Sequence, residues 1–390
     1  MSASLVIRNA RLSPPNPPLA DVLVSGGMIQ AVEAAGTGAA ADTVIEAGGR
    51  VLLPGFVDAH THACWAGDRL AEFEMKLRGA GYLDILKAGG GILSTVRAVR
   101  AASGSELAEN LLQRLGLMLK EGTTTVEVKS GYGLTTRDEL KMLRAIAAAA
   151  QRFPGTIVPT ALLGHAIDPD QPRFVDTVVN ETLPAVHDEF PGIAIDAFCE
   201  EGAWSVADCR RLFERARSLG HPIRLHADQF NRLGGLDLGL EFGALSLDHL
   251  EASSDEDLRR LAQSPAFGVM LPACGFNVDG RYANGRALLD AGGKLVLASN
   301  CNPGSAPTHS IPFVIALAVR KLGLSVREAI TSTTLTAAQL LGFKDRGAIA
   351  PGLRADLVLL RHRDERYLAQ EFGGNPVDQV VCGGEVVRGG

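Results

Sequence analysis

Two histidines separated by a single residue are the first side chains of this chain that could do chemistry. His60 and His62 directly follow the apolar run Gly55-Phe-Val-Asp58, which is typical of a short β-strand. Because side chains alternate across a strand with a period of two, both imidazoles would lie on one face at its carboxyl end. Two converging imidazoles suit a metal ion, although a pair of solvated loop histidines would show the same spacing.

Further polar residues follow later apolar runs, each at the point where a run ends. They are His165, His226, Asp248, His249 and Asn300. A single histidine at such a place is often a packing residue. In a barrel of parallel strands, however, all the carboxyl ends meet at one rim, so these side chains would converge on one pocket.

The elements that must position these residues lie in the middle of the chain, at residues 54–343. Strand-like runs alternate there with helical patterns, which is typical of a parallel sheet. About eight runs over about 290 residues fit one (β/α)8 TIM-like barrel of the α/β class, although a doubly wound open sheet has a similar pattern. The runs are 55–58, 123–128, 156–163, 193–198, 223–226, 244–247, 267–271 and 294–298.

Both ends of the chain have a different character. Residues 1–53 and 344–390 carry short runs rich in Val and Ile, separated by Gly, Pro and Asn, which predict small antiparallel strands. We therefore expect the two ends to build one small β-sandwich together, with the barrel of residues 54–343 inserted between its two parts.

Composition excludes several classes of protein. With 46% hydrophobic and 21% charged residues, the 390-residue chain can bury a large core, which argues against disorder. The net charge of −6 is not gathered into runs, so we expect no nucleic-acid face and no membrane patch. Six scattered cysteines without a C-x-x-C pair predict neither a disulfide scaffold nor a thiolate zinc site. A cytoplasmic protein is expected.

Longer strings resemble a known family. Pro54-Gly-Phe-Val-Asp-Ala-His60-Thr-His62 resembles the opening metal motif of the amidohydrolase superfamily, whose (β/α)8 barrel is flanked by a β-sandwich made from both chain ends. Other strings, in order along nearly the whole chain, are similar to the imidazolonepropionase family. They are Leu77-Arg-Gly-Ala-Gly-Tyr82-Leu-Asp-Ile, Gly89-Gly-Gly-Ile-Leu-Ser-Thr95, Val128-Lys-Ser-Gly-Tyr132-Gly-Leu, His226-Ala-Asp-Gln229 and Asn302-Pro-Gly-Ser305.

This resemblance implies hydrolysis of 4-imidazolone-5-propanoate to N-formimidoyl-L-glutamate, a step of histidine degradation, with one zinc or iron ion. The ion would be held by His60, His62 and His226, with position 300 beside it, and would acidify the water that attacks the ring. His249 would move protons or stabilise the oxyanion that forms, because an imidazole titrates near neutral pH.

The resemblance also implies a set of substrate contacts. A guanidinium such as that of Arg69 can hold a propanoate bidentately, although an isolated Arg often forms only a surface ion pair. Gln229 offers both a donor and an acceptor to an amide ring, so it is placed with the catalytic and the substrate-binding residues. The partner is a small anionic cyclic amide, and a homodimer is expected from the family. The substrate residues are Arg69, Tyr132, His165, Gln229, Asn302, Gly304 and Ser305.

One position departs from the family. Where the family has aspartate, in a string like Thr-Asp-x-Asn-Pro-Gly, this chain reads Ser299-Asn300-Cys-Asn-Pro-Gly304. Asparagine is a weaker metal ligand than a carboxylate and cannot accept a proton as a general base does. Two explanations stay open: a lineage in which His249 or Asp228 takes the proton, or a change that stops turnover.

Three hypotheses on function follow. The first is hydrolysis of imidazolone propanoate, and the second is hydrolysis of another small cyclic amide that carries a carboxylate. The third is a catalytically silent protein that binds a metal and a ligand, which the neutral Asn300 favours. Lys129 stands where a carboxylated lysine bridges two metals in some amidohydrolases, but its string is similar to the one-metal family, so we expect one ion.

Overall fold

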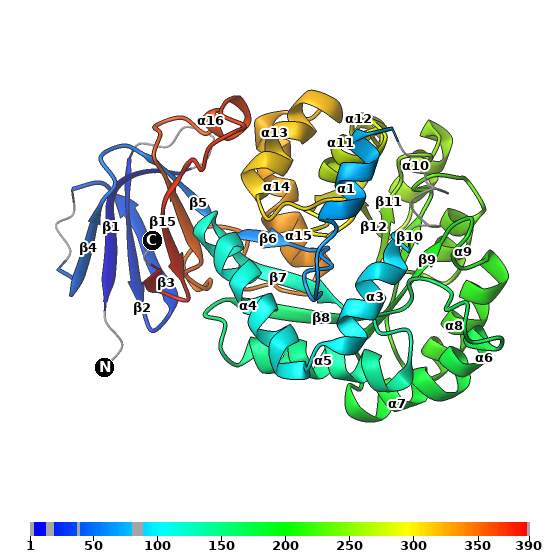
Figure 1. The fold of residues 1–390 in the computed structure, drawn as a ribbon. Helices are drawn as coiled ribbons and strands as arrows, with labels where there is room; N and C mark the ends of the chain where they lie inside the picture. The colour runs from blue at the N-terminus through cyan, green and yellow to red at the C-terminus, as the bar shows by residue number, and fades with distance from the viewer. Residues whose placement is uncertain (1–3, 13–18, 37–39, 80–88, 388–390) are drawn as a thin grey trace.

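The computed structural model describes residues 4–12, 19–36, 40–79 and 89–387, and its strands form two eight-stranded sheets (Figure 1). One sheet lies in the middle of the chain, and the other combines strands from its two ends. The string around Tyr82 lies largely outside the described residues.

The central sheet is a parallel barrel. Its strands lie side by side in sequence order from β6 to β13, and each neighbouring pair is parallel. The first and last strands meet at an isolated parallel bridge between Thr61 and Asn300. The expected (β/α)8 class is therefore confirmed, and the open doubly wound sheet is wrong. The strands are β6 (Phe56–Asp58), β7 (Thr123–Lys129), β8 (Thr156–Gly164), β9 (Ala194–Cys199), β10 (Ile223–Ala227), β11 (Ser246–His249), β12 (Phe267–Met270) and β13 (Lys294–Leu297).

Helices surround this barrel. Several begin at a Ser or Thr whose side chain accepts from the third backbone N–H of the helix, as at Ser103, Thr135 and Ser205. Their apolar faces and the barrel share one continuous core. The helices are α1 (Leu70–Leu77), α3 (Ile92–Ala101), α4 (Gly104–Lys120), α5 (Thr136–Ala150), α6 (Phe174–Thr177), η1 (Val178–Thr182), α7 (Leu183–Glu189), α8 (Val206–Ser218), α9 (Gly235–Glu241), α10 (Asp255–Ala262), α11 (Pro272–Val278), α12 (Gly285–Asp290), α13 (Ile311–Lys321), α14 (Val326–Ser332), α15 (Leu335–Leu340) and α16 (Tyr367–Gln370).

The second sheet joins the two ends of the chain, as expected. Its order is β16-β15-β14-β5-β1-β2-β3, with β4 paired to β1. The expectation of antiparallel strands is wrong in part: β4 and β5 run parallel to β1, because the chain returns beside β1 after the β2–β3 hairpin. The strands are β1 (Leu5–Leu12), β2 (Ala20–Ser25), β3 (Met28–Ala34), β4 (Thr43–Glu46), β5 (Val51–Pro54), β14 (Leu357–Leu360), β15 (Val377–Cys382) and β16 (Glu385–Val387).

Strand β5 connects the two units through both of its faces. Val51 and Leu53 pack into the core of the barrel, while Leu52 packs into the separate core of the second sheet. The alternation follows from the period of two along a strand. β5 therefore ties the two cores together directly before β6 begins; the domain boundaries expected at 53/54 and 343/344 stay a prediction.

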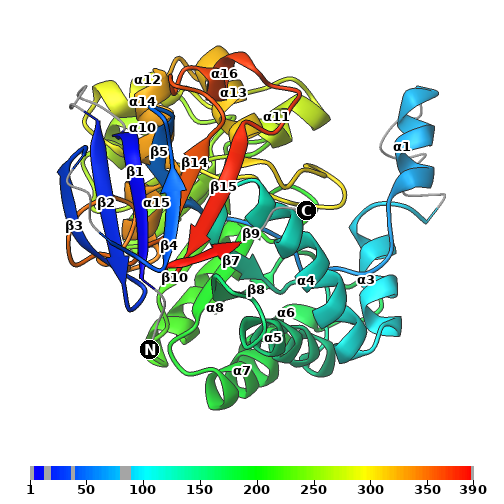
Figure 2. The ribbon, with the colours of Figure 1, turned by 90° about the vertical axis from the view of Figure 1, so that its left-hand side faces the viewer.

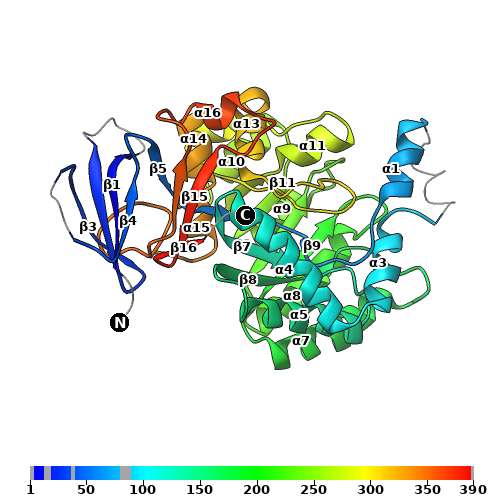
Figure 3. The same cartoon turned by 60° about the vertical axis from the view of Figure 1, so that its left-hand side comes forward.

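Helix α1 stands away from the rest of the barrel (Figures 2 and 3). Leu70 and Leu77 are 70% and 72% exposed, so the helix buries little of its apolar face among the described residues. Arg69, the residue directly before the helix, nevertheless reaches the barrel. In the described part of the chain, we find no helix long and apolar enough to cross a membrane.

Candidate active site

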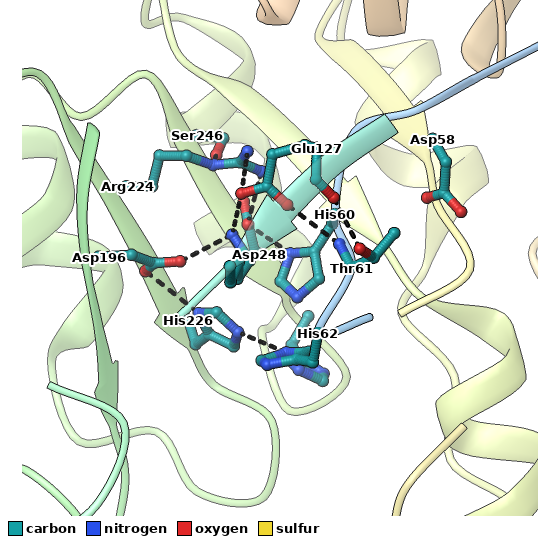
Figure 4. Close-up of polar contacts among 12 residues, drawn as sticks. Asp58, His60, Thr61, His62, Glu127, Asp196, Arg224, His226, Ser246 and Asp248 are labelled. Carbon is teal, nitrogen blue, oxygen red and sulfur yellow. Dashed lines mark hydrogen bonds and ion pairs between the residues drawn. The ribbon is translucent and has the colours of Figure 1, made fainter. Parts of the chain in front are cut away.

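Three buried histidines lie side by side at the carboxyl ends of β6 and β10 (Figure 4). His60 Nδ1 lies 2.6 Å from Asp248 Oδ2, and His226 Nδ1 lies 3.1 Å from Asp196 Oδ1. The Nε2 atoms of His62 and His226 are 3.4 Å apart. A carboxylate on one ring nitrogen leaves the other ring nitrogen free as a ligand, an arrangement found around metal ions in proteins.

The unpaired atoms of this cluster fit a metal ion. His60 Nε2, His62 Nδ1 and Asn300 Oδ1 are buried without a hydrogen-bond partner among the described residues, which is costly unless another group binds them. Burial lowers the pKa of His60, His62 and His226, which keeps the three imidazoles neutral, as a ligand must be. The donor set therefore suits one ion bound mainly by imidazole nitrogens.

Asn300 is fixed beside these histidines by the backbone. Its N–H donates to His60 O at 3.1 Å, and its C=O accepts from the N–H of His62 at 3.3 Å. Its side chain donates from Nδ2 to Ser305 Oγ at 3.1 Å. The residue has φ 67°, in the left-handed region that Asn and Asp tolerate better than other non-Gly residues. The structure thus places the one departure from the family beside the predicted metal ligands.

His249 lies in the same cluster but in a different electrostatic environment. Its ring centroid is 5.9 Å from that of His60 and 5.4 Å from that of His226. Burial acts to lower its pKa, but the Glu251 carboxylate and Cys274 outweigh burial and raise that pKa to about 10. A ligand atom of His249 also lies within 4.8 Å of ligand atoms of His60 and His226. Because Glu251 and Cys274 favour the protonated imidazole when no metal binds it, we assign His249 to hydrogen-bond donation in the reaction and not to the ligand set of His60, His62 and His226.

The predicted substrate residues Arg69 and Gly304 also lie together. A Cβ atom added to Gly304 would meet Arg69 Nη1 at 3.0 Å, so the guanidinium lies directly against this glycine. Arg69 Nε donates to Glu72 Oε2 at 2.6 Å, and Nη1 lies 3.4 Å from Thr95 Oγ1. Glu72 was not predicted from the sequence, and it fixes the guanidinium against the 302–305 turn.

The 302–305 turn is built by one side chain. Asn302 Oδ1 accepts from the backbone N–H groups of Gly304 at 2.8 Å and Ser305 at 3.2 Å. Asn277 Nδ2 donates to the carbonyl of Ser305 at 3.1 Å from the outer side. Asn302 therefore stabilises this turn, in addition to its predicted role in substrate binding.

Tyr132 and His165 join the Arg69 region to the histidines. The ring of His165 is stacked on His62 with centroids 5.0 Å apart, and Tyr132 lies 4.9 Å from His165. Burial lowers the pKa of His165 to about 3 and raises the pKa of the Tyr132 hydroxyl, so both are neutral. Glu139, which the sequence did not single out, holds this loop by accepting from the N–H groups of Gly131 and Gly133 at 2.9 Å and 2.7 Å.

The remaining candidates lie on the far side of His249. Gln229 Nε2 donates to Cys274 Sγ at 3.3 Å, and Cys274 is in turn close to His249. Asp228, the alternative proton acceptor, instead accepts from Ser253 Oγ at 2.7 Å. The structure thus brings every predicted site residue into one connected cluster, while the carboxylate of Asp228 is engaged elsewhere.

A buried network of charges beneath the histidines was missed by sequence reasoning. Lys129 Nζ donates to Glu127 Oε1 at 2.8 Å and to Asp196 Oδ2 at 2.9 Å, and Arg224 Nη2 donates to Asp248 Oδ2 at 2.8 Å (Figure 4). The sequence did contain an indication of this network. Glu127 and Lys129 are two positions apart in one strand, so their side chains lie on the same face. This face is the interior of the barrel.

Replacement of Lys129 by methionine is expected to lower the free energy of unfolding by about 3 to 5 kcal/mol, because it removes one partner from a fully buried ion network. Urea denaturation measures this change. Lys294→Met is the matched control: Lys294 is exposed and donates to Pro265 O at 3.0 Å, so we expect a loss of about 1 kcal/mol or less. Equal losses in both variants would contradict the structural role of the network.

Comparisons with known proteins agree with this architecture. Residues 51–387 match the model of the amidohydrolase family. The chain is similar in fold to a 5-methylcytosine deaminase from Klebsiella pneumoniae, with a TM-score of 0.78 and 18% identity over 98% of each chain. It is also similar to an N-isopropylammelide isopropylaminohydrolase from Burkholderia multivorans, with a TM-score of 0.73 and 20% identity over 99% and 98% of the two chains. At these identities the likeness shows the fold.

Curated relatives are more similar in sequence. An imidazolonepropionase from Herpetosiphon aurantiacus is 47% identical, over 89% of this chain and 84% of the relative. Another, from Symbiobacterium thermophilum, is 46% identical over 88% and 83% of the two chains. The chain therefore belongs to the amidohydrolase family and, within it, to the group of these imidazolonepropionases.

Proposed function

We propose that this chain hydrolyses 4-imidazolone-5-propanoate to N-formimidoyl-L-glutamate in histidine degradation. The observation that carries the proposal is the buried cluster of His60, His62 and His226 in a chain 47% identical to an imidazolonepropionase. Within this cluster, His60 Nε2 and His62 Nδ1 have no hydrogen-bond partner among the described residues. Imidazole ligands accept zinc and iron alike, so we propose one ion of either metal. When bound, the ion would lower the pKa of a water molecule enough for it to attack the ring.

The residues of the cluster would then have three different roles. His60, His62 and His226 hold the ion, while Asp248 and Asp196 orient the rings of His60 and His226. His249 donates a hydrogen bond to the carbonyl oxygen of the substrate ring as that oxygen becomes negative. It can do so because Glu251 and Cys274 raise its pKa and favour the protonated imidazole.

The carboxylate of the substrate would be bound about the 302–305 turn. Arg69 provides the positive charge, and the Tyr132 hydroxyl and the His165 ring lie between it and His62. Gln229 borders the opposite side and can offer both an acceptor and a donor to the ring. The substrate is thus expected to extend from the histidines to Arg69.

Turnover of imidazolone propanoate, followed by the loss of the ultraviolet absorbance of its ring, tests this function. A panel of cyclic amides with and without an acidic side chain tests the substrate class. Hydrolysis restricted to another acid-bearing ring would favour the second hypothesis, and tight ligand retention without product would favour a silent binder. Hydrolysis of imidazolone propanoate, without hydrolysis of the other cyclic amides, supports the proposal.

Replacement of Arg69 by alanine is expected to raise the KM for imidazolone propanoate about 10- to 100-fold, since a hydrogen-bonded charge pair contributes about 1.5 to 3 kcal/mol. Metal content, measured by atomic absorption, should stay unchanged. Arg78→Ala serves as the control, because Arg78 is exposed and pairs only with Glu74 among the contacts of its side chain that we describe. An unchanged KM would remove Arg69 from the substrate site.

We also infer a cytoplasmic location and a homodimer. All six cysteines are free and buried, which is typical of proteins in reducing compartments. The homodimer rests on the family alone, and sedimentation of the purified chain would test it.

A further inference from the structure

A second group of metal-binding side chains lies next to the histidine cluster. One ligand atom from each of His249, Glu251 and Cys274 lies within 4.8 Å of the other two. His249 Nδ1 is 3.2 Å from Glu251 Oε1. Cys274 and His249 are each 2% exposed, and the Glu251 side chain is 6% exposed. A thiolate, an imidazole and a carboxylate are the three ligand types that zinc binds in proteins.

The backbone brings these side chains together from the ends of two adjacent strands. His249 ends β11, and both His249 and Leu250 adopt positive φ values, 85° and 72°, which are uncommon outside glycine. The backbone turns at these two residues, and Glu251 therefore contacts the ring of His249. Cys274 lies in α11, directly after β12, which is paired with β11.

A buried atom without a partner points to a missing ligand at this place. Glu251 Oε2 is buried without a hydrogen-bond partner in the described part of the chain, although an unpaired carboxylate oxygen is costly to bury. Gln229 Nε2 donates to Cys274 Sγ at 3.3 Å, which fixes the sulfur beside this carboxylate. A cation would satisfy both the carboxylate oxygen and the sulfur.

A small pocket borders the same side chains. Its lining includes Gln229, Phe230, Glu251 and Cys274. The sulfur and the carboxylate therefore border a pocket that does not include His60, His62 or His226 among its lining residues.

We propose that His249, Glu251 and Cys274 form a second, inhibitory zinc site, with water as the fourth ligand. On binding, Zn²⁺ displaces the proton of the Cys274 thiol and the proton on the ligating nitrogen of His249, and both protons pass to solvent. His249 then has no proton to donate at that nitrogen and is held away from the substrate. Zinc beyond one equivalent would therefore stop the hydrolysis; this inhibitory role rests on the proposed function.

Cobalt titration of the metal-free chain tests the site without relying on activity. We expect two Co²⁺ ions per chain, and the second should produce the thiolate-to-cobalt charge-transfer absorption in the near ultraviolet. Cys274→Ala and Cys274→Ser should bind one ion without this absorption. Cys382→Ala is the matched control, because Cys382 is buried in the second sheet and its thiol donates to Pro154 O. Absence of the absorption in the parent chain, or its persistence in Cys274→Ala, would overturn the proposal.

Zinc inhibition gives a second, kinetic readout. With the first site loaded, we expect excess zinc to lower the parent rate at least 10-fold, and Cys274→Ala to need at least 10-fold more zinc for the same loss. Each rate is compared with that of the same variant at one equivalent of metal. If the parent chain turns over no imidazolone propanoate, the proposed function fails, whereas the cobalt titration still decides the second site. Equal zinc inhibition of the parent and Cys274→Ala would contradict the inhibitory site.

Discussion

Replacing Asn300 by aspartate is expected to raise the turnover of imidazolone propanoate by about 10²- to 10⁴-fold, the usual contribution of a general base. The backbone of Asn300 is hydrogen-bonded to the backbones of His60 and His62, and its side-chain Oδ1 is buried without a described partner. An aspartate there would offer a proton acceptor at the position where the family has one.

The other buried carboxylates near the histidines cannot easily take this role. Asp248 binds His60 and Arg224, and Asp196 binds His226 and Lys129. These contacts occupy both carboxylate oxygens of Asp196, and they bind Oδ2 of Asp248 to an imidazole and to a guanidinium. The parent chain is consequently expected to turn over slowly.

The fold should accept aspartate at position 300. Both Asn and Asp tolerate the positive φ found there, and Ser305 Oγ can donate to a carboxylate after rotation of its hydroxyl. Asn284→Asp is the matched control: Asn284 is exposed and caps α12, where aspartate can also act as the cap. The change removes the hydrogen bond from Nδ2 to Asp255 at the surface, and we expect no change in rate. Equal rates for the parent chain and Asn300→Asp would assign proton transfer to another group, and His249 would be tested next.

Loss of His60 is expected to remove the metal. Replacement by alanine deletes one imidazole and leaves Asp248 with Arg224 as its remaining partner. Changes to groups that only orient a ligand already cost 10- to 100-fold in metal affinity, so removal of a ligand should cost more than about 100-fold. In the Cys274→Ala background, which lacks the proposed second site, His60→Ala should lower the metal content after dialysis from about one ion per chain to less than about a tenth. Turnover should fall with it.

His362→Ala provides the control for this experiment. His362 lies outside the barrel, stacks on Tyr367 with ring centroids 4.1 Å apart and binds Glu371 at 3.0 Å. We expect its metal content to equal that of the parent chain. If His60→Ala also kept its metal, the assignment of the ligand set would be wrong, and His249 would have to be considered as a ligand.

Much of the barrel could be predicted from the sequence because its signals are local. The run at 123–128 and the strand β7 (Thr123–Lys129) differ by one residue, and the run at 223–226 and β10 (Ile223–Ala227) also differ by one. A buried parallel strand is a continuous apolar run, and the polar residue that ends it marks the rim. The pattern of such runs was therefore enough to place His60, His226 and Asn300 on one rim.

What the sequence could not provide depends on contacts between distant segments. Glu251 and Cys274 are 23 positions apart, and only the pairing of β11 with β12 and the positive φ of His249 bring them together. The sequence also does not show which aspartate contacts a histidine. Asp228 binds Ser253, whereas Asp248 binds His60. The parallel pairing of β1 with β4 and β5 was missed for the same reason.

The position of β5 in its sheet has a consequence for the order in which the protein is made. β5 lies between β1 and β14, but β14 is synthesised about 300 residues after it. At about 5 to 20 residues per second, a ribosome needs about 15 to 60 s to reach β14. During that time one edge of β5 has no strand to pair with, and such an edge invites pairing with other chains. The nascent chain is thus most prone to aggregate before its last strands emerge, even though its barrel can already fold.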